Sequence, residues 1–133
     1  MKTVLFLGTL FIGSAIACPQ FNLKNVTCTS ADGSAYKVDS MELKGSTLTV
    51  SVEGQKLAKT FPERDVDSNW ITELKCDGNK IIMTETIGNV TASNVTVLDG
   101  QTSKSTGKEL EADQDFSGKY INAQTVNAAE LCK

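Results

Sequence analysis

Residues 70–100 read WITELKCDGNKIIMTETIGNVTASNVTVLDG, and this stretch decides the fold class. Apolar and polar residues alternate over 70–76, and isoleucine, valine and threonine dominate 80–87 and 89–98. Alternation with a period of two and β-branched residues is typical of half-buried strands. Asp-Gly pairs follow two of these runs, and glycine supplies the positive φ that a tight turn requires. The stretch therefore predicts consecutive antiparallel strands joined by tight turns.

The same pattern extends outward through most of the chain, with glycine-containing turn signals at short intervals. It predicts an all-β fold, an antiparallel meander of about eight strands that closes into a small barrel. A two-sheet β-sandwich is the alternative. Residues 61–65 and 100–107 are expected to be loops, and 127–131 a single helical turn. The expected strands are 20–29, 34–43, 47–53, 55–61, 70–76, 80–87, 89–98 and one or two within 106–126.

Residues 1–17 have the composition of a secretory signal peptide. Lys2 provides a short positive region, an apolar run follows, and Ala15-Ile16-Ala17 matches the small-x-small pattern before a cleavage site. No later run is long and apolar enough to predict a transmembrane segment. We therefore expect a secreted or periplasmic protein with one β domain at residues 18–133.

Four cysteines follow the leader, at positions 18, 28, 76 and 132, which predicts two disulfides with three pairings open. Pairing Cys18 with Cys28 requires a turn near Lys24-Asn25, because a straight strand would hold them about 30 Å apart. Pairing Cys18 with Cys132 would clasp the two ends of the domain. Cys18 also stands where a lipoprotein carries its lipid, so a lipid anchor through Cys18 is the alternative localisation.

Charge and composition exclude several classes of function. Removing the leader with its one lysine leaves a net charge of −4, without the basic stripe that nucleic acid binding requires. The chain contains no histidine, which excludes Ser–His, Cys–His and histidine–metal chemistry. No catalytic residue is predicted, and an enzyme is the less favoured interpretation.

Two sets of residues are candidate binding groups. Asp113, Asp115 and Ser117, followed by Gly118, have the spacing that opens an EF-hand-type loop, so calcium is the one metal considered. Gln124 stands where that loop needs a bidentate glutamate, however. If the barrel is hollow, Trp70 and Tyr36 are the natural residues to stack on a small ligand.

The opening Cys18-Pro19, Leu23 and Cys28, followed by Asp32-Gly33, resembles a group of small exported bacterial proteins of unknown role. In those proteins a Cys-Pro…Cys strand directly after the signal peptide precedes a β meander. The resemblance implies the fold class and no activity.

We therefore predict a non-catalytic secreted or periplasmic protein that binds a small ligand or a protein partner. For an inhibitor-type partner, the loops to test are 61–69 and 100–107. A structural or surface-coat protein with an unpaired edge strand is one alternative. A carboxylate-based or calcium-dependent hydrolase is the other, and its candidate acids are Glu63, Asp65, Asp67, Glu73, Glu109 and Asp113.

Overall fold

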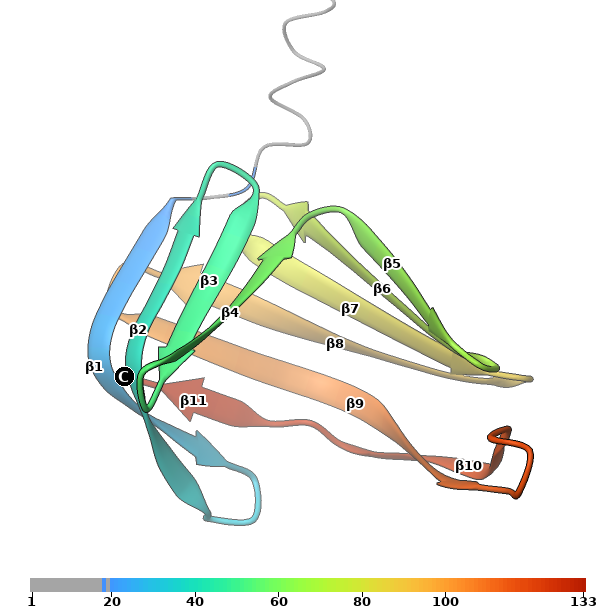
Figure 1. The fold of residues 1–133 in the computed structure, drawn as a ribbon. Coiled ribbons are helices and arrows are strands. Elements are labelled where there is room, and N and C mark those ends of the chain that lie inside the picture. The colour runs from blue at the N-terminus through green and yellow to red at the C-terminus, as the bar shows by residue number, and fades with distance from the viewer. Residues whose placement is uncertain (1–17, 19) are drawn as a thin grey trace, which may run out of the picture.

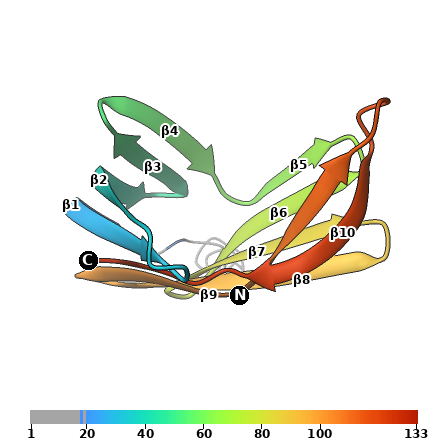
Figure 2. The same cartoon turned by 90° about the horizontal axis from the view of Figure 1, so that it is seen from below.

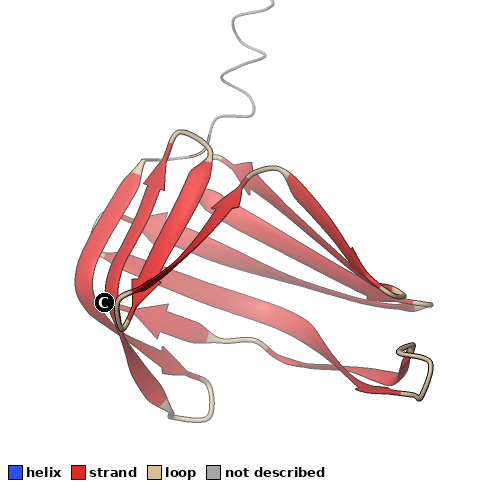
Figure 3. Ribbon diagram, in the orientation of Figure 1, coloured by secondary structure: helices blue, strands red, loops and turns tan. Residues whose placement is uncertain are grey.

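The structure is a computed structural model that describes Cys18 and residues 20–133 (Figure 1). The predicted signal peptide at residues 1–17 lies outside the described residues. Strands and the turns between them account for the whole described part, in which no helix is present (Figure 3). No helix there could cross a membrane.

Eleven strands form one antiparallel sheet, which confirms the predicted all-β meander. The strand order is β4-β3-β2-β1-β11-β9-β8-β7-β6-β5, and β10 pairs with β9. Because all strands belong to one sheet, the two-sheet alternative is wrong. The strands are β1 (Phe21–Ser30), β2 (Ala35–Lys44), β3 (Thr47–Val52), β4 (Gln55–Thr60), β5 (Glu63–Asp67), β6 (Trp70–Asp77), β7 (Lys80–Ile87), β8 (Val90–Asp99), β9 (Thr102–Gln114), β10 (Tyr120–Asn127) and β11 (Glu130–Cys132).

The structure has eleven strands where about eight were predicted, and the predicted assignment is wrong in three places. Residues 61–65 were expected to be a loop, but Glu63–Asp67 is a strand that begins directly after Pro62 and pairs with β6. Residues 102–107 belong to the long strand β9. The expected helical turn at 127–131 is absent: Asn127 ends β10, and Glu130 and Leu131 belong to the short strand β11. These segments are polar or short, so they carry little of the apolar alternation that marks a strand. Neighbouring strands supply the pairing that their own sequences do not indicate.

The sheet curls into a bowl and nearly closes into a barrel (Figure 2). Strands β1–β4 rise on one side, β5, β6 and β10 rise on the other, and β8 and β9 form the base. The C-terminal strand β11 lies between β1 and β9, so the last strand of the chain pairs with the first. Strands β4 and β5 end the strand order and are joined by the corner at Phe61 and Pro62.

The two strands that end the strand order, β4 and β5, carry many charged side chains. Lys59 and Glu63 form an ion pair of 2.9 Å across the corner between β4 and β5. Charged side chains on an exposed edge discourage pairing with another sheet. The edges at β4 and β5 are therefore poorly suited to strand addition.

Two disulfides hold the bowl together, Cys18–Cys76 and Cys28–Cys132. The sequence leaves three pairings open. The observed one is neither the pairing of neighbouring cysteines nor the pairing of Cys18 with Cys132. Its cause is the strand order, because β1 lies beside β11 with Cys28 directly opposite Cys132. A lipid anchor would require the Cys18 sulfur, which the bond to Cys76 occupies.

The main core fills the disulfide end of the bowl. Every second residue of β1 faces inward, and a residue at positive φ, Asn25, shifts the alternation by one position in mid-strand. Burial of these apolar surfaces is the main stabilising term for a domain of this size. The core residues are Cys18, Phe21, Leu23, Val26, Cys28, Val38, Leu43, Phe61, Ile81, Leu98 and Cys132.

A bend at Gly107 turns the second half of β9 away from β8. The β8–β9 ladder ends at the pair Asn94 and Gly107, and β9 then pairs with β10. At Gly107 φ is +130°, and a Cβ there would lie 2.5 Å from the Ser93 carbonyl oxygen. Only glycine fits this bend. We call the β9–β10 hairpin beyond Gly107 the arm; it packs its Leu110 against Ile87 and Ala92, in a second small core.

Candidate functional site

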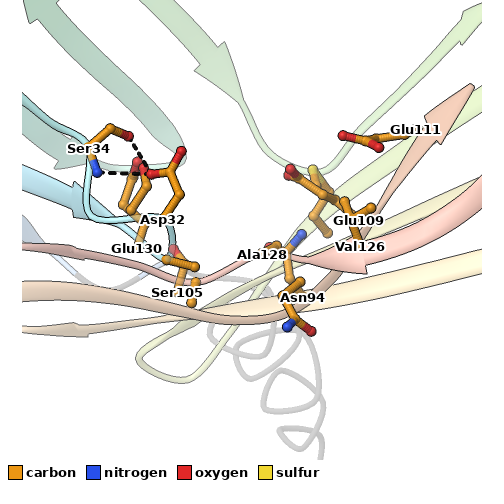
Figure 4. Close-up of a pocket in the computed structure, with 14 residues that line it drawn as sticks. Asp32, Ser34, Asn94, Ser105, Glu109, Glu111, Val126, Ala128 and Glu130 are labelled. Atoms are coloured by element: carbon orange, nitrogen blue, oxygen red, sulfur yellow. Dashed lines mark hydrogen bonds between the residues drawn. The ribbon is translucent and has the colours of Figure 1, made fainter.

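A cavity of about 460 Å³ occupies the concave side of the sheet between the β1–β2 turn and the arm. We call it the trough. Asp32, Ser34 and Glu130 stand on one wall and Glu109 and Glu111 on the other, with an open space between them (Figure 4). Pockets that hold small ligands have volumes in this range. The remaining lining residues are Ser30, Ala31, Met83, Asn94, Ser105, Val126, Asn127, Ala128 and Ala129.

The charged lining of the trough is entirely acidic. Four carboxylates line it, at Asp32, Glu109, Glu111 and Glu130, and no lysine or arginine does. Within residues 20–133, the ion pairs are Lys59–Glu63 and Arg64–Glu73, and both lie outside the trough. Neither of these ion pairs therefore involves a carboxylate of the trough.

This charge changes the titration of Glu109. Partial removal from water raises the pKa of the Glu109 carboxyl, and the negative charges of three neighbouring glutamates raise it further (Glu85, Glu111 and Glu130). Asp32 has the opposite shift, because hydrogen bonds from the Ser34 hydroxyl and N–H lower its pKa. In the trough, the surroundings thus favour the ionised form of Asp32 and disfavour the ionised form of Glu109.

Tyr36 and Trp70, the two aromatic residues expected to bind a ligand, lie apart and each holds a glutamate. The Tyr36 hydroxyl donates to Glu130 Oε2 at 3.0 Å, on the wall formed by the β1–β2 turn. Partial burial and this acceptor raise the pKa of Tyr36 to about 12. Tyr36 therefore orients a trough carboxylate and does not itself line the cavity.

Trp70 lies beneath the arm and likewise donates a hydrogen bond to a glutamate, Glu85. Its indole Nε1 donates to Glu85 Oε2 at 3.0 Å, and the Leu110 N–H donates to Glu85 Oε1 at 3.0 Å. The Tyr120 ring packs edge-on against Trp70, with the ring centroids 4.9 Å apart. The arm thus packs on the Trp70 side chain, which also lines an open hollow of about 580 Å³ beside the arm, and ligand stacking on it stays a prediction.

Three glutamates at or beside the trough were not among the residues predicted from the sequence: Glu85, Glu111 and Glu130. Glu85 continues the inward-facing series of Ile81, Met83 and Ile87 on β7. An acid at an apolar position of an alternating strand is the signal that could have identified it. Glu111 and Glu130 carry no such signal, because the arm and β11 bring them to the trough from distant parts of the chain.

The residues of the suggested calcium loop form the turn of the arm. Asp115 Oδ1 accepts hydrogen bonds from the Ser117 N–H, the Ser117 hydroxyl and the Lys119 N–H, at 2.7–3.0 Å. Asp113 Oδ2 accepts from Asn122 at 3.1 Å. Both carboxylates therefore serve the turn and the ladder, and calcium binding there stays a prediction. Within the described residues, one set of three potential ligand side chains lies close enough together to hold a metal ion: Cys28, Glu130 and Cys132. The two cysteine sulfurs of this set are bonded to each other in a disulfide.

An apolar recess of about 210 Å³ adjoins the trough. Met83, Asn94, Ser105 and Glu130 line both spaces. The recess extends toward the main core and is otherwise mostly apolar, lined by Met41, Leu48, Phe61, Leu74, Ile81 and Leu98 together with Lys59, Thr96 and Ser103. An acidic trough that continues into an apolar recess offers two kinds of surface to one ligand.

No protein-family model matches this chain, and no curated protein and no solved structure is significantly similar to it.

Proposed function

We propose that this protein is a non-catalytic, exported binding protein that holds a small organic cation in the trough. The two disulfides support an oxidising extracellular or periplasmic environment. The observation that carries the proposal is a cavity of about 460 Å³ whose charged lining is only acidic.

The chemistry of the lining favours a cationic ligand. Carboxylates that lack a basic partner repel one another, and this repulsion contributes to the raised pKa of Glu109. A ligand with positive charge relieves the repulsion, and carboxylates on both walls allow it to be held at two points. Because the ligand binds only the folded protein, its binding also stabilises the fold.

The apolar recess adds a second element of recognition. A cation whose ammonium groups occupy the trough can place hydrocarbon against Met83 and the apolar residues behind it. Apolar surface removed from water contributes about 25 cal/mol per Å². The ligand class is therefore an amine or quaternary ammonium compound with an apolar portion, such as a diamine with a hydrocarbon chain.

Isothermal titration calorimetry of the mature protein tests the proposal with 1,8-diaminooctane as the probe. We expect saturable binding with a Kd below about 1 mM, which corresponds to roughly −4 kcal/mol. The neutral isostere 1,8-octanediol should bind at least about tenfold more weakly, since it lacks the charges. Added salt should weaken the binding of the diamine by screening.

Two variants locate the site. The double variant Glu109→Gln with Glu111→Gln should weaken diamine binding, whereas Glu73→Gln, on an exposed carboxylate paired with Arg64, should not. Equal loss in both variants, or equal binding of the diol and the diamine, would contradict the proposal.

A carboxylate-based hydrolase is the second candidate, because Glu109 combines a raised pKa with nearby carboxylates, as a general acid does. The lining of the trough contains no aromatic residue on which a sugar ring could stack. Hydrolysis of aryl glycosides that is abolished by Glu109→Gln would support this candidate. Retained hydrolysis in that variant, or none in the wild type, would remove it.

A further inference from the structure

Phe116 stands at the tip of the arm, fully exposed to solvent. Its relative exposure is 111%, against 74% for Leu57, the next most exposed large apolar residue in the described part of the chain. An exposed phenylalanine forfeits the stabilisation that burial of a large aromatic surface provides. Phe116 lies in the turn between β9 and β10, which ends the arm (Figure 1).

The turn that carries Phe116 is rigidly hydrogen-bonded. Residues 114–119 contain two backbone hydrogen bonds between Asp115 and its turn partners, Asp115 N–H to the Lys119 carbonyl (2.9 Å) and Gly118 N–H to the Asp115 carbonyl (3.0 Å). Asp115 Oδ1 accepts three further bonds, and Gln114 Nε2 donates to the Gly118 carbonyl at 3.0 Å. The backbone on both sides of Phe116 is therefore held in one conformation.

The arm is also fastened to the rest of the protein. Asn69, in the β5–β6 turn, forms two hydrogen bonds with the backbone of Tyr120, at 2.7 and 2.9 Å. The Tyr120 hydroxyl donates to Asp67 Oδ2 at 2.7 Å. These bonds at Tyr120, the residue that directly follows the turn, restrain movement of the turn relative to the bowl.

We propose that the turn at residues 115–119 is a docking tip for a partner protein, with Phe116 as the side chain that inserts into the partner. Aromatic anchors that fill a pocket dominate many protein interfaces. A turn that is already ordered loses little conformational entropy on binding, which favours affinity.

The charges around the tip define the chemistry of the partner. Asp113 and Asp115 lie on the arm and Asp67 lies beside Tyr120, whereas Lys119 is the one base within residues 109–120. The partner surface is therefore an apolar pocket with a basic rim. The same acidic surroundings disfavour an anionic membrane as the target of Phe116.

Site-specific photo-crosslinking in the exported fraction of the native organism begins the test. The photoreactive p-benzoylphenylalanine replaces Phe116 in one protein and Leu57 in the control. Leu57 is also exposed but lies on β4, far from the arm in the sheet order. We expect an adduct with one protein at position 116 and not at 57. Equal adducts at both positions, adducts of the chain with itself alone, or none, would overturn the proposal.

The crosslinked protein is then purified and its affinity measured by surface plasmon resonance. Phe116→Ala should weaken binding at least about tenfold, and Leu57→Ala by less than about twofold. Asp115→Ala keeps Phe116 but releases the turn, and should weaken binding by about threefold or more. Equal affinity of the wild type and Phe116→Ala would refute the docking tip. Because the trough is not altered, Phe116→Ala should bind 1,8-diaminooctane like the wild type, so the two proposals fail independently.

Discussion

The indole Nε1 of Trp70 donates a 3.0 Å hydrogen bond to the carboxylate of Glu85, which is only 8% exposed. This bond connects β6 to β7, and the second oxygen of the same carboxylate accepts the Leu110 N–H of the arm. A buried carboxylate is stable only when its oxygens are hydrogen-bonded. Glu85 therefore couples the position of the arm, and with it one wall of the trough, to the sheet below.

Removing the Trp70 donor should destabilise the fold measurably. Trp70→Phe keeps an aromatic ring against Tyr120 but leaves Glu85 Oε2 without its indole donor, at a cost of about 1–3 kcal/mol. Tyr36→Phe is the matched control, because it removes a similar bond to Glu130 at an exposed site and should cost less. Urea denaturation measures the free energy of unfolding of both variants. Equal losses of stability would contradict the role of burial at Glu85.

The Asn69 side chain should determine how firmly the arm is attached. Asn69→Ala removes both hydrogen bonds to the Tyr120 backbone, and we expect a loss of about 1–3 kcal/mol. In this variant, hydrogen–deuterium exchange of the β10 backbone amides should become faster relative to exchange of the β2 amides. Asn22→Ala, on the exposed face of β1, is the control and should change neither quantity. Unchanged exchange in β10 would show that other contacts hold the arm.

Gly107 should be the most sensitive of the glycines to substitution. A Cβ there would meet the Ser93 carbonyl oxygen at 2.5 Å and Asn94 Cα at 2.7 Å, and φ is +130°. We expect Gly107→Ala to lower the free energy of unfolding by at least about 2 kcal/mol. Gly100→Ala is the control, since no atom lies within 4 Å of its added Cβ. A loss of similar size in both variants would argue against the bend at Gly107.

Glu109 should make the stability depend on pH in a defined direction. Its pKa is raised in the folded protein, so the folded state binds more protons than the unfolded state above the ordinary value of 4.5. Stability from this group therefore falls as pH rises through the raised pKa. Glu109→Gln removes the penalty, and should be more stable than the wild type at pH 7.

The difference between Glu109→Gln and the wild type should shrink as the pH falls toward about 4, where both are neutral at this position. Thermal unfolding across this range measures the difference. A constant difference at every pH would show that charge repulsion at Glu109 is not its cause.

Several features of the fold could be predicted from residues that act locally. Alternation over residues 70–98 predicts β6, β7 and β8 because side chains of a strand point to opposite faces in turn. Their predicted bounds differ from the observed ones by no more than one residue at either end. Strand β5 was missed, since its charged sequence has no apolar face and only its pairing with β6 makes it a strand.

The candidate site could be predicted only in part. Glu109 was among the acids considered. Tyr36 and Trp70 were expected near a ligand; each donates a hydrogen bond to a carboxylate, and ligand stacking on them stays a prediction. Asp115 was a candidate calcium ligand; its side chain accepts hydrogen bonds from its own turn, and calcium binding there stays a prediction. The side chains were recognised as chemically important, but their partners depend on contacts between distant strands.

By itself the sequence determined the all-β class, the antiparallel meander and the presence of two disulfides, because alternation, turn glycines and an even cysteine count are local or compositional properties. Only the tertiary structure decided which cysteines pair and which carboxylates share the trough. Cys28 meets Cys132 because β11 inserts between β1 and β9, and Glu130 faces Glu109 because the arm bends at Gly107. Both outcomes depend on strand order and on one backbone bend, which join residues far apart in the chain.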